Sequence, residues 1–137
     1  CSCSKEDLGT KIILIGIDGA DWKVMLPLVK EGMLPNIASL MERGVSAWCR
    51  TFKPAKSPVI WTSIATGVGP EKHGIVDYDV VVDPEKGLVV PVTSNARKVN
   101  ALWNILSEAG LRVGVVGWWA SWPAEEVNGF IISDHDV

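Results

Sequence analysis

KIILIGID, at residues 11–18, is the stretch that decides the fold, because it is a near-continuous apolar run that ends at an Asp-Gly pair. A run of this kind predicts a strand buried on both faces, as in a parallel sheet. Shorter apolar runs predict further strands at Val45 to Thr51, Val113 to Gly117 and Phe130 to Ile132. We interpret residues 1–10 as a polar leader or tether and residues 11–137 as one domain.

Capping residues and helical spacing predict helices between these strands. Residues 21–31 have Asp21 as N-cap and Gly32 as stop, and residues 34–43 carry a proline in the first turn. Ser57 to Gly67 begins with an N-cap serine and ends at a glycine, and Lys98 to Ala109 is amphipathic. Residues 76–82 and 88–92 flank a turn and predict a hairpin. The order predicts an α/β fold with a largely parallel sheet flanked by helices.

Composition bounds the class of protein. The chain has 137 residues, is 47% hydrophobic and carries a formal net charge of −3, which predicts a folded domain and no nucleic-acid partner. No apolar run is long enough for a transmembrane helix. Cys49 lies in an apolar stretch and predicts a buried free thiol. Cys1 before a polar segment suits a lipid-anchored, extracytoplasmic protein (periplasmic or cell-surface), although a trimmed start explains it equally well.

Asp18 and Ser57 are the candidate reactive residues. In open parallel sheets ligands bind beyond the carboxyl ends of the strands, where Asp18 and the loop carrying Ser57 are expected to lie. Ser57 begins a helix, whose unpaired N–H groups attract anions. A divalent metal held by Asp18 would activate the serine hydroxyl, and Lys56 would add positive charge. On spacing alone, the simpler interpretation is that Ser57 is only an N-cap and Asp18 only a turn residue.

Other polar and aromatic residues have two interpretations each. His73 could bind a metal, but we favour a histidine that is exposed or bonded to the backbone. The tail Asp134-His135-Asp136 resembles a metal motif or is a strand end running into a polar loop. The group Trp118, Trp119 and Trp122 indicates core and loop packing, which we favour, or the wall of a substrate pocket.

Five segments together resemble the type I phosphodiesterase/nucleotide pyrophosphatase family of the alkaline phosphatase superfamily. They are IILIGIDGADW (12–22), LPNIASLMERGV (34–45), SPVIWTSIATG (57–67), PEKHGI (70–75) and ALWNILSEAGLRVGVVGWWASWPAEEVNG (101–129). The resemblance covers nearly everything after residue 10. It implies an alkaline-phosphatase-like fold, of which this chain is the amino-terminal part and an incomplete domain.

The resemblance also implies roles for single residues. Asp18 becomes a metal ligand, and Ser57 becomes the nucleophile that bridges the metals and forms a covalent phospho-enzyme. The implied cofactors are two divalent metal ions, of which zinc is the expected one. Most metal ligands of the family lie further downstream, and no metal role is carried onto Asp134 or His135. We therefore expect this chain to hold only part of the site and to be inactive by itself.

Three functions remain open at this stage. The leading one is a metal-dependent hydrolase of phosphate esters, acting on a small-molecule or lipid substrate whose binding residues are unknown. The second is a phosphotransferase acting on lipid-borne phosphate groups, for which an extracytoplasmic tether through Cys1 would be suitable. The third is a non-catalytic binding or scaffold domain with the same fold.

Overall fold

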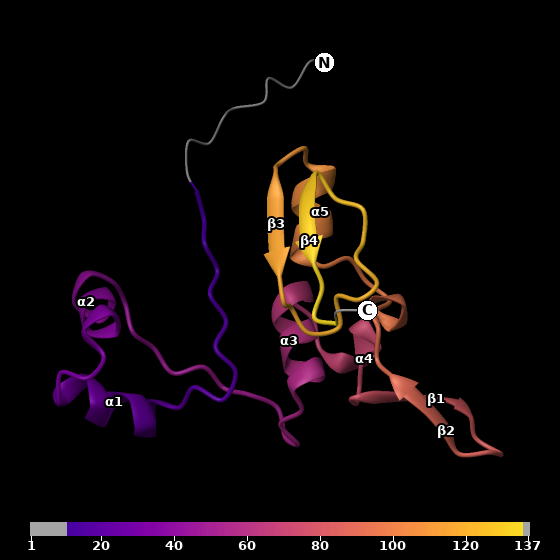
Figure 1. Ribbon diagram of the computed structural model, residues 1–137, viewed down its shortest axis with the longest axis horizontal. Coiled ribbons are helices and arrows are strands. Elements are labelled where there is room, and N and C mark those ends of the chain that lie inside the picture. Colours follow the sequence, from indigo (N-terminus) through magenta and orange to yellow (C-terminus); the bar gives the residue numbers. More distant parts are fainter. Residues whose placement is uncertain (1–10, 136–137) are drawn as a thin grey trace. The chain divides into compact units, whose positions relative to one another are not determined.

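The computed structural model describes residues 11–135, and the chain divides between Trp48 and Cys49 into two compact units (Figure 1). The predicted leader, including Cys1, lies outside the described residues, as does Asp136. In the described part of the chain, no helix has the length and hydropathy needed to cross a membrane. Each unit is considered by itself.

The first unit contains two helices, α1 (Trp22–Lys30) and α2 (Pro35–Arg43), which contact each other. The Asp21 carboxylate caps α1 by accepting the Lys23 N–H at 2.8 Å. Gly32, with φ of +73°, lies in the turn between the helices. Both predicted helices are therefore confirmed, because local residues specify each start: the Asp21 cap for α1 and the proline at the first position of α2.

The predicted strands at 11–18 and 45–51 are wrong. Both segments lack regular structure, and Ile12 is 88% exposed and Val45 98% exposed. A strand exists only when a neighbouring strand supplies hydrogen-bond partners, and no described segment pairs with either of these. The predicted burial of Cys49 is wrong for the same reason, because no sheet forms over it and the thiol is exposed.

The second unit is mixed α/β and contains small sheets. Its elements are α3 (Ser57–Thr66), α4 (Pro70–His73), β1 (Asp79–Asp83), β2 (Leu88–Pro91), the 3-10 helix η1 (Ser94–Ala96), α5 (Leu102–Glu108), β3 (Val113–Val116) and β4 (Gly129–Ile132). β1 and β2 form an antiparallel hairpin in which Asp79 lies opposite Pro91. β3 and β4 are parallel, with Val113 opposite Gly129. The hairpin and the two later strands were predicted, but the sheets are two-stranded and only one is parallel.

Two helix starts differ from prediction. Lys56 occupies the N-cap position of α3, so Ser57 is the first helical residue and not the cap. α5 begins at Leu102, and the Asn104 side chain accepts the Ala101 N–H at 2.8 Å. In both cases proline or a side-chain acceptor at the first turn sets the helix start.

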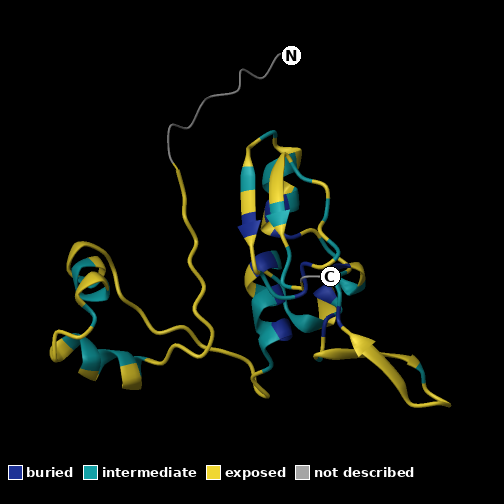
Figure 2. Ribbon diagram, in the orientation of Figure 1, coloured by how far each residue is buried: buried dark blue, intermediate teal, exposed yellow. Residues whose placement is uncertain are grey.

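The core of the second unit holds α3 in place. One buried cluster joins α3, α5 and β3 through Ala65, Ala101, Trp103 and Val115. Figure 2 shows the buried positions in this unit, whereas the β1–β2 hairpin is mostly exposed. In the described part of the first unit no residue is buried. Burial of apolar area therefore stabilises α3, which carries Ser57, far more than it stabilises the turn that carries Asp18.

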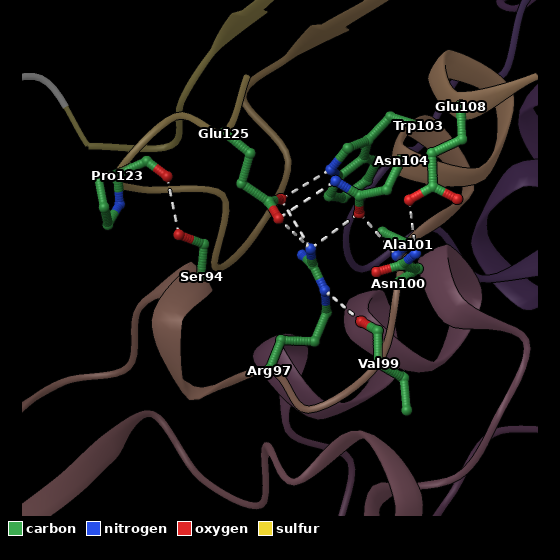
Figure 3. A network of polar contacts seen from close by, with 10 residues as sticks. All are labelled: Ser94, Arg97, Val99, Asn100, Ala101, Trp103, Asn104, Glu108, Pro123 and Glu125. Carbon is green, nitrogen blue, oxygen red and sulfur yellow. Dashed lines mark hydrogen bonds and ion pairs between the residues drawn. The ribbon is translucent and has the colours of Figure 1, made fainter. Parts of the chain in front are cut away.

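Arg97 is the centre of a polar network that braces this core (Figure 3). Its side chain is 5% exposed, and its Nη2 donates to both Glu125 oxygens at 2.6 and 2.7 Å. Nη2 also donates to Asn104 Oδ1 at 3.0 Å, and Nε donates to the Val99 carbonyl at 2.9 Å. Trp103 Nε1 donates to Glu125 at 2.9 Å. Because these groups satisfy one another, the network is structural.

Candidate active site around Ser57

Ser57 is presented at the first position of a well-anchored helix. Pro58 and Val59, the next two residues, are buried, and Gly67 ends the helix in the left-handed region at φ of +69°. Ser57 itself is half-buried. Within the described residues no hydrogen bond engages its hydroxyl. A serine side chain that is accessible, uncommitted and attached to a rigid helix is suitable for reaction with a ligand.

The backbone N–H of Ser57 points to a tyrosine. It donates to the Tyr78 hydroxyl oxygen at 3.3 Å, across 21 positions of sequence. Lys56 forms a close ion pair with Asp77, whose Oδ1 also accepts the Tyr78 N–H at 2.8 Å. The hydrogen bond from Lys56 lowers the pKa of Asp77 below its usual value. The positive charge expected from Lys56 is therefore balanced by a carboxylate.

The tryptophan group divides between the two interpretations. Trp118 packs edge-on against Trp61 and Trp103, at ring-centroid distances of 5.2 and 6.0 Å, and its Nε1 donates to the Trp61 carbonyl. Trp118 therefore belongs to the core packing, as favoured. Trp119 instead packs edge-on against Tyr78, at a ring-centroid distance of 5.8 Å. Trp119 is therefore linked to Ser57 through Tyr78, whose hydroxyl accepts the Ser57 N–H.

Asp18 lies in the first unit, in a turn with Gly19 that follows the exposed run and precedes α1. Gly19 has φ of +70°, a conformation that glycine adopts without strain. The Asp18 carboxylate is exposed, and within residues 11–135 no hydrogen bond engages it. Ser57 lies in the second unit, so the pairing of Asp18 with Ser57 stays a prediction.

The two predicted ligands, Asp18 and Ser57, both offer oxygen donors to a metal ion. A carboxylate and a serine oxygen are suitable donors for zinc or another divalent ion. Zinc normally takes four ligands, however, and the described residues contain no group of three or more His, Cys, Asp or Glu side chains able to hold a metal. Asp18 and Ser57 therefore fit the ion chemically but do not complete its coordination sphere.

His73 is used inside the protein. It is fully buried, its Nε2 lies 2.9 Å from Ser63 Oγ, and its Nδ1 accepts the Ile75 N–H at 3.1 Å. Burial lowers the pKa of His73 below its ordinary value of 6.5 and favours the neutral ring. The expected bond to the backbone is confirmed, although the residue is not exposed.

Asp134 holds together the loop at residues 118–122, which carries three tryptophans. Its carboxylate accepts the backbone N–H groups of Ala120, Ser121 and Trp122 at 2.8, 3.1 and 3.1 Å. Ala120 has φ of +55°, so the loop needs this anchor to hold a strained turn. His135 is exposed beside it. These contacts give Asp134 a structural role.

A hollow in the first unit is a poor candidate for a metal-binding or catalytic site. It is lined by Trp22, Leu26, Met41, Ser46, Ala47 and Trp48. None of these side chains is ionisable in the neutral pH range. The reactive residues predicted from the sequence are not among them.

Comparison with known proteins identifies the family. The family model "Type I phosphodiesterase / nucleotide pyrophosphatase" matches residues 12–134, which is most of the chain and includes Asp18 and Ser57. The chain belongs to this family. Type I phosphodiesterases and nucleotide pyrophosphatases are hydrolases, and the family implies an alkaline-phosphatase-like fold.

Among individual relatives, the chain is similar to snake-venom enzymes of this phosphodiesterase class. It is 31% identical over 104 residues to a venom phosphodiesterase from Macrovipera lebetinus and 30% identical over 105 residues to venom phosphodiesterase 2 from Crotalus adamanteus. Each alignment covers 72% of this chain but only 12% of the relative, so the chain spans about an eighth of their length. No solved structure matches the chain.

Sequence reasoning missed Asp77, Tyr78 and Trp119 as neighbours of Ser57. Tyr78 is the only tyrosine in the chain and lies three residues after the 70–75 segment of the family resemblance. That position is the one signal that could have indicated it. Nothing in the spacing links Trp119 to the serine, because their proximity arises from packing through Tyr78.

Proposed function

We propose that the full-length protein is a metal-dependent hydrolase of phosphate esters, in which Ser57 is the nucleophile and Asp18 a ligand of a two-metal site. The observation that carries this proposal is the uncommitted hydroxyl of Ser57 at the start of a buried helix, inside the region matched by the phosphodiesterase family. The simpler interpretation, a capping serine, loses support because Lys56 occupies the cap position.

The chemistry assigned to this chain is a displacement at phosphorus. The Ser57 oxygen loses its proton to solvent and attacks the phosphorus atom, so that a new P–O bond forms. The P–O bond to the leaving group breaks with its electron pair, and the departing alkoxide takes a proton from solvent to leave as the alcohol. Water then attacks the phosphoserine and releases the phosphoryl product, and the serine hydroxyl is restored. When bound, two divalent ions, expected to be zinc, would supply charge neutralisation and lower the pKa of the hydroxyl.

The supported substrate class is a phosphate ester, either a small molecule or a lipid. The names of the relatives favour a diester, because they are phosphodiesterases. A diester carries one negative charge, fewer than a monoester, and so needs less positive charge around it. This agrees with the surroundings of Ser57, where Asp77 already balances the charge of Lys56. No nucleic-acid partner is proposed, since the chain is acidic overall.

We further propose an extracytoplasmic location with a lipid tether at Cys1. The support is the sequence alone, in which a cysteine precedes a polar segment. Mass spectrometry of the amino-terminal peptide from native membranes tests this directly. Detection of diacylglycerol on the Cys1 sulfur supports the tether, and an unmodified Cys1 overturns it.

The experiment for the hydrolase proposal uses the full-length protein. Hydrolysis of a chromogenic phosphodiester and of the matching monoester is measured for the wild type and for Ser57→Ala, with and without a chelator. We expect chelation and Ser57→Ala each to lower kcat by at least about 10³-fold, as for other nucleophile removals. Thr66→Ala, which removes a hydroxyl from the last turn of the same helix, serves as the matched control and keeps activity.

The outcomes separate the alternatives. Full activity of Ser57→Ala excludes Ser57 as the nucleophile. Absence of hydrolysis in the wild type, with phosphoryl transfer to an added alcohol, indicates a phosphotransferase. Absence of both reactions together with no bound metal indicates a binding or scaffold domain.

A further inference from the structure

The Tyr78 hydroxyl lies beside the backbone of Ser57, the proposed nucleophile. Tyr78 follows Asp77, precedes β1, and its hydroxyl oxygen accepts the Ser57 N–H at 3.3 Å. Tyr78 is 43% exposed, so a ligand can reach the residue. The edge-on contact with Trp119, at 5.8 Å and an interplanar angle of 77°, supports the ring from the side.

The hydroxyl proton of Tyr78 is available to a ligand. In the bond from Ser57 the phenol oxygen is the acceptor, so that bond does not use its proton. No other hydrogen bond within residues 11–135 involves this hydroxyl. The neighbouring cation, Lys56, is already paired with Asp77. Tyr78 therefore offers an O–H donor beside the Ser57 backbone, where the neighbouring Lys56 charge is balanced by Asp77.

We propose that Tyr78 is a catalytic residue that contacts the substrate: its O–H donates a hydrogen bond to a non-bridging phosphoryl oxygen during attack by Ser57, and Trp119 positions the ring. This inference rests on the proposed function, because it needs Ser57 to be the nucleophile. Charge on the phosphoryl oxygens changes as the serine attacks, and a preorganised donor stabilises that change.

The test compares Tyr78→Phe with the wild type in the full-length protein. Phenylalanine keeps the ring and its contact with Trp119 and removes only the hydroxyl. We expect kcat/KM for a chromogenic phosphodiester to fall about 100-fold, as when one oxyanion donor is removed. Trp119→Leu should give a smaller fall. Trp122→Leu, which removes a tryptophan from the same loop, should change kcat/KM by less than about two-fold.

A second readout separates contact with substrate from a structural role. Each variant is assayed with the two phosphorothioate diastereomers of the same diester, because sulfur accepts hydrogen bonds poorly. If Tyr78 donates to one of the two oxygens, Tyr78→Phe reduces the rate penalty of sulfur at that oxygen, whereas a structural role leaves both penalties unchanged. If Ser57→Ala is inactive, then unchanged sulfur penalties, or full activity of Tyr78→Phe, overturn the role of Tyr78 alone. Full activity of Ser57→Ala overturns the proposed function and this inference together.

Discussion

Replacing Arg97 by Met tests how much the polar network of the second unit stabilises its core. The substitution removes two hydrogen bonds to Glu125, one to Asn104 and one to the Val99 carbonyl. Methionine keeps an apolar side chain against the Trp103 ring, over which the guanidinium lies at 5.3 Å. Glu125 then retains only its bonds from Trp103 and Asn104.

The magnitude follows from the burial of the two partners. Breaking a buried ion pair costs about 3–5 kcal/mol, whereas an exposed pair contributes less than about 1 kcal/mol. Arg97 is 5% exposed but Glu125 is 28% exposed, so water can partly rehydrate the carboxylate left behind. We therefore expect a loss of about 2–3 kcal/mol in the opening free energy of α5 and β3.

Native-state hydrogen exchange of the full-length protein measures this loss locally. Amides of α5 and β3 should exchange about 30- to 150-fold faster in Arg97→Met, since 1.4 kcal/mol corresponds to tenfold. Lys86→Met, which breaks the exposed pair with Asp83, is the control and should change exchange by less than about two-fold. An Arg97→Met effect no larger than that of the control would refute the buried-network reasoning.

The same network predicts a pH dependence. Burial by itself raises the pKa of Glu125, but the hydrogen bonds from Arg97 and Trp103 and the charge of Arg97 outweigh it, so the pKa lies below its usual value. A lowered pKa contributes stability above the unfolded-state pKa, and this contribution disappears as the pH falls through the folded-state value. The difference between wild type and Arg97→Met should therefore shrink in acid.

Three further predictions concern the second unit, each read by hydrogen exchange. Burial lowers the pKa of His73, so the unfolded state takes up a proton at a higher pH than the folded state does. Helices α3 and α4 should therefore lose protection from exchange as the pH falls below 6.5. His73→Gln, whose side chain can still pair with Ser63, should remove that pH dependence. Asp134→Asn should destabilise residues 118–122 by about 1–3 kcal/mol, because an amide cannot accept all three backbone bonds; equal exchange in both proteins would contradict the anchoring role. Gly129→Ala should abolish the protection of β3 and β4, because a Cβ at residue 129 would meet the Val113 oxygen at 1.8 Å. Retained protection would show that the two strands shift enough to relieve this clash and still stay paired.

Local signals in the sequence determined the helices and the hairpin. Asp21 caps α1, Gly67 ends α3, and the turn at residues 84–87 joins β1 to β2, as their residue types predicted. These elements depend on neighbours a few positions away, so sequence alone could specify them. Family resemblance, confirmed by the match over residues 12–134, also came from the sequence.

Only tertiary structure decided which apolar runs became strands and what surrounds Ser57. Residues 113–116 pair with 129–132, whereas the equally apolar run at 12–15 has no partner within the described residues, and apolar character alone does not supply hydrogen bonds. Tyr78 reaches Ser57 because α3 and the segment before β1 are held by the same unit. Side chains distant in sequence meet through packing, and packing depends on the whole folded unit and not on any local pattern.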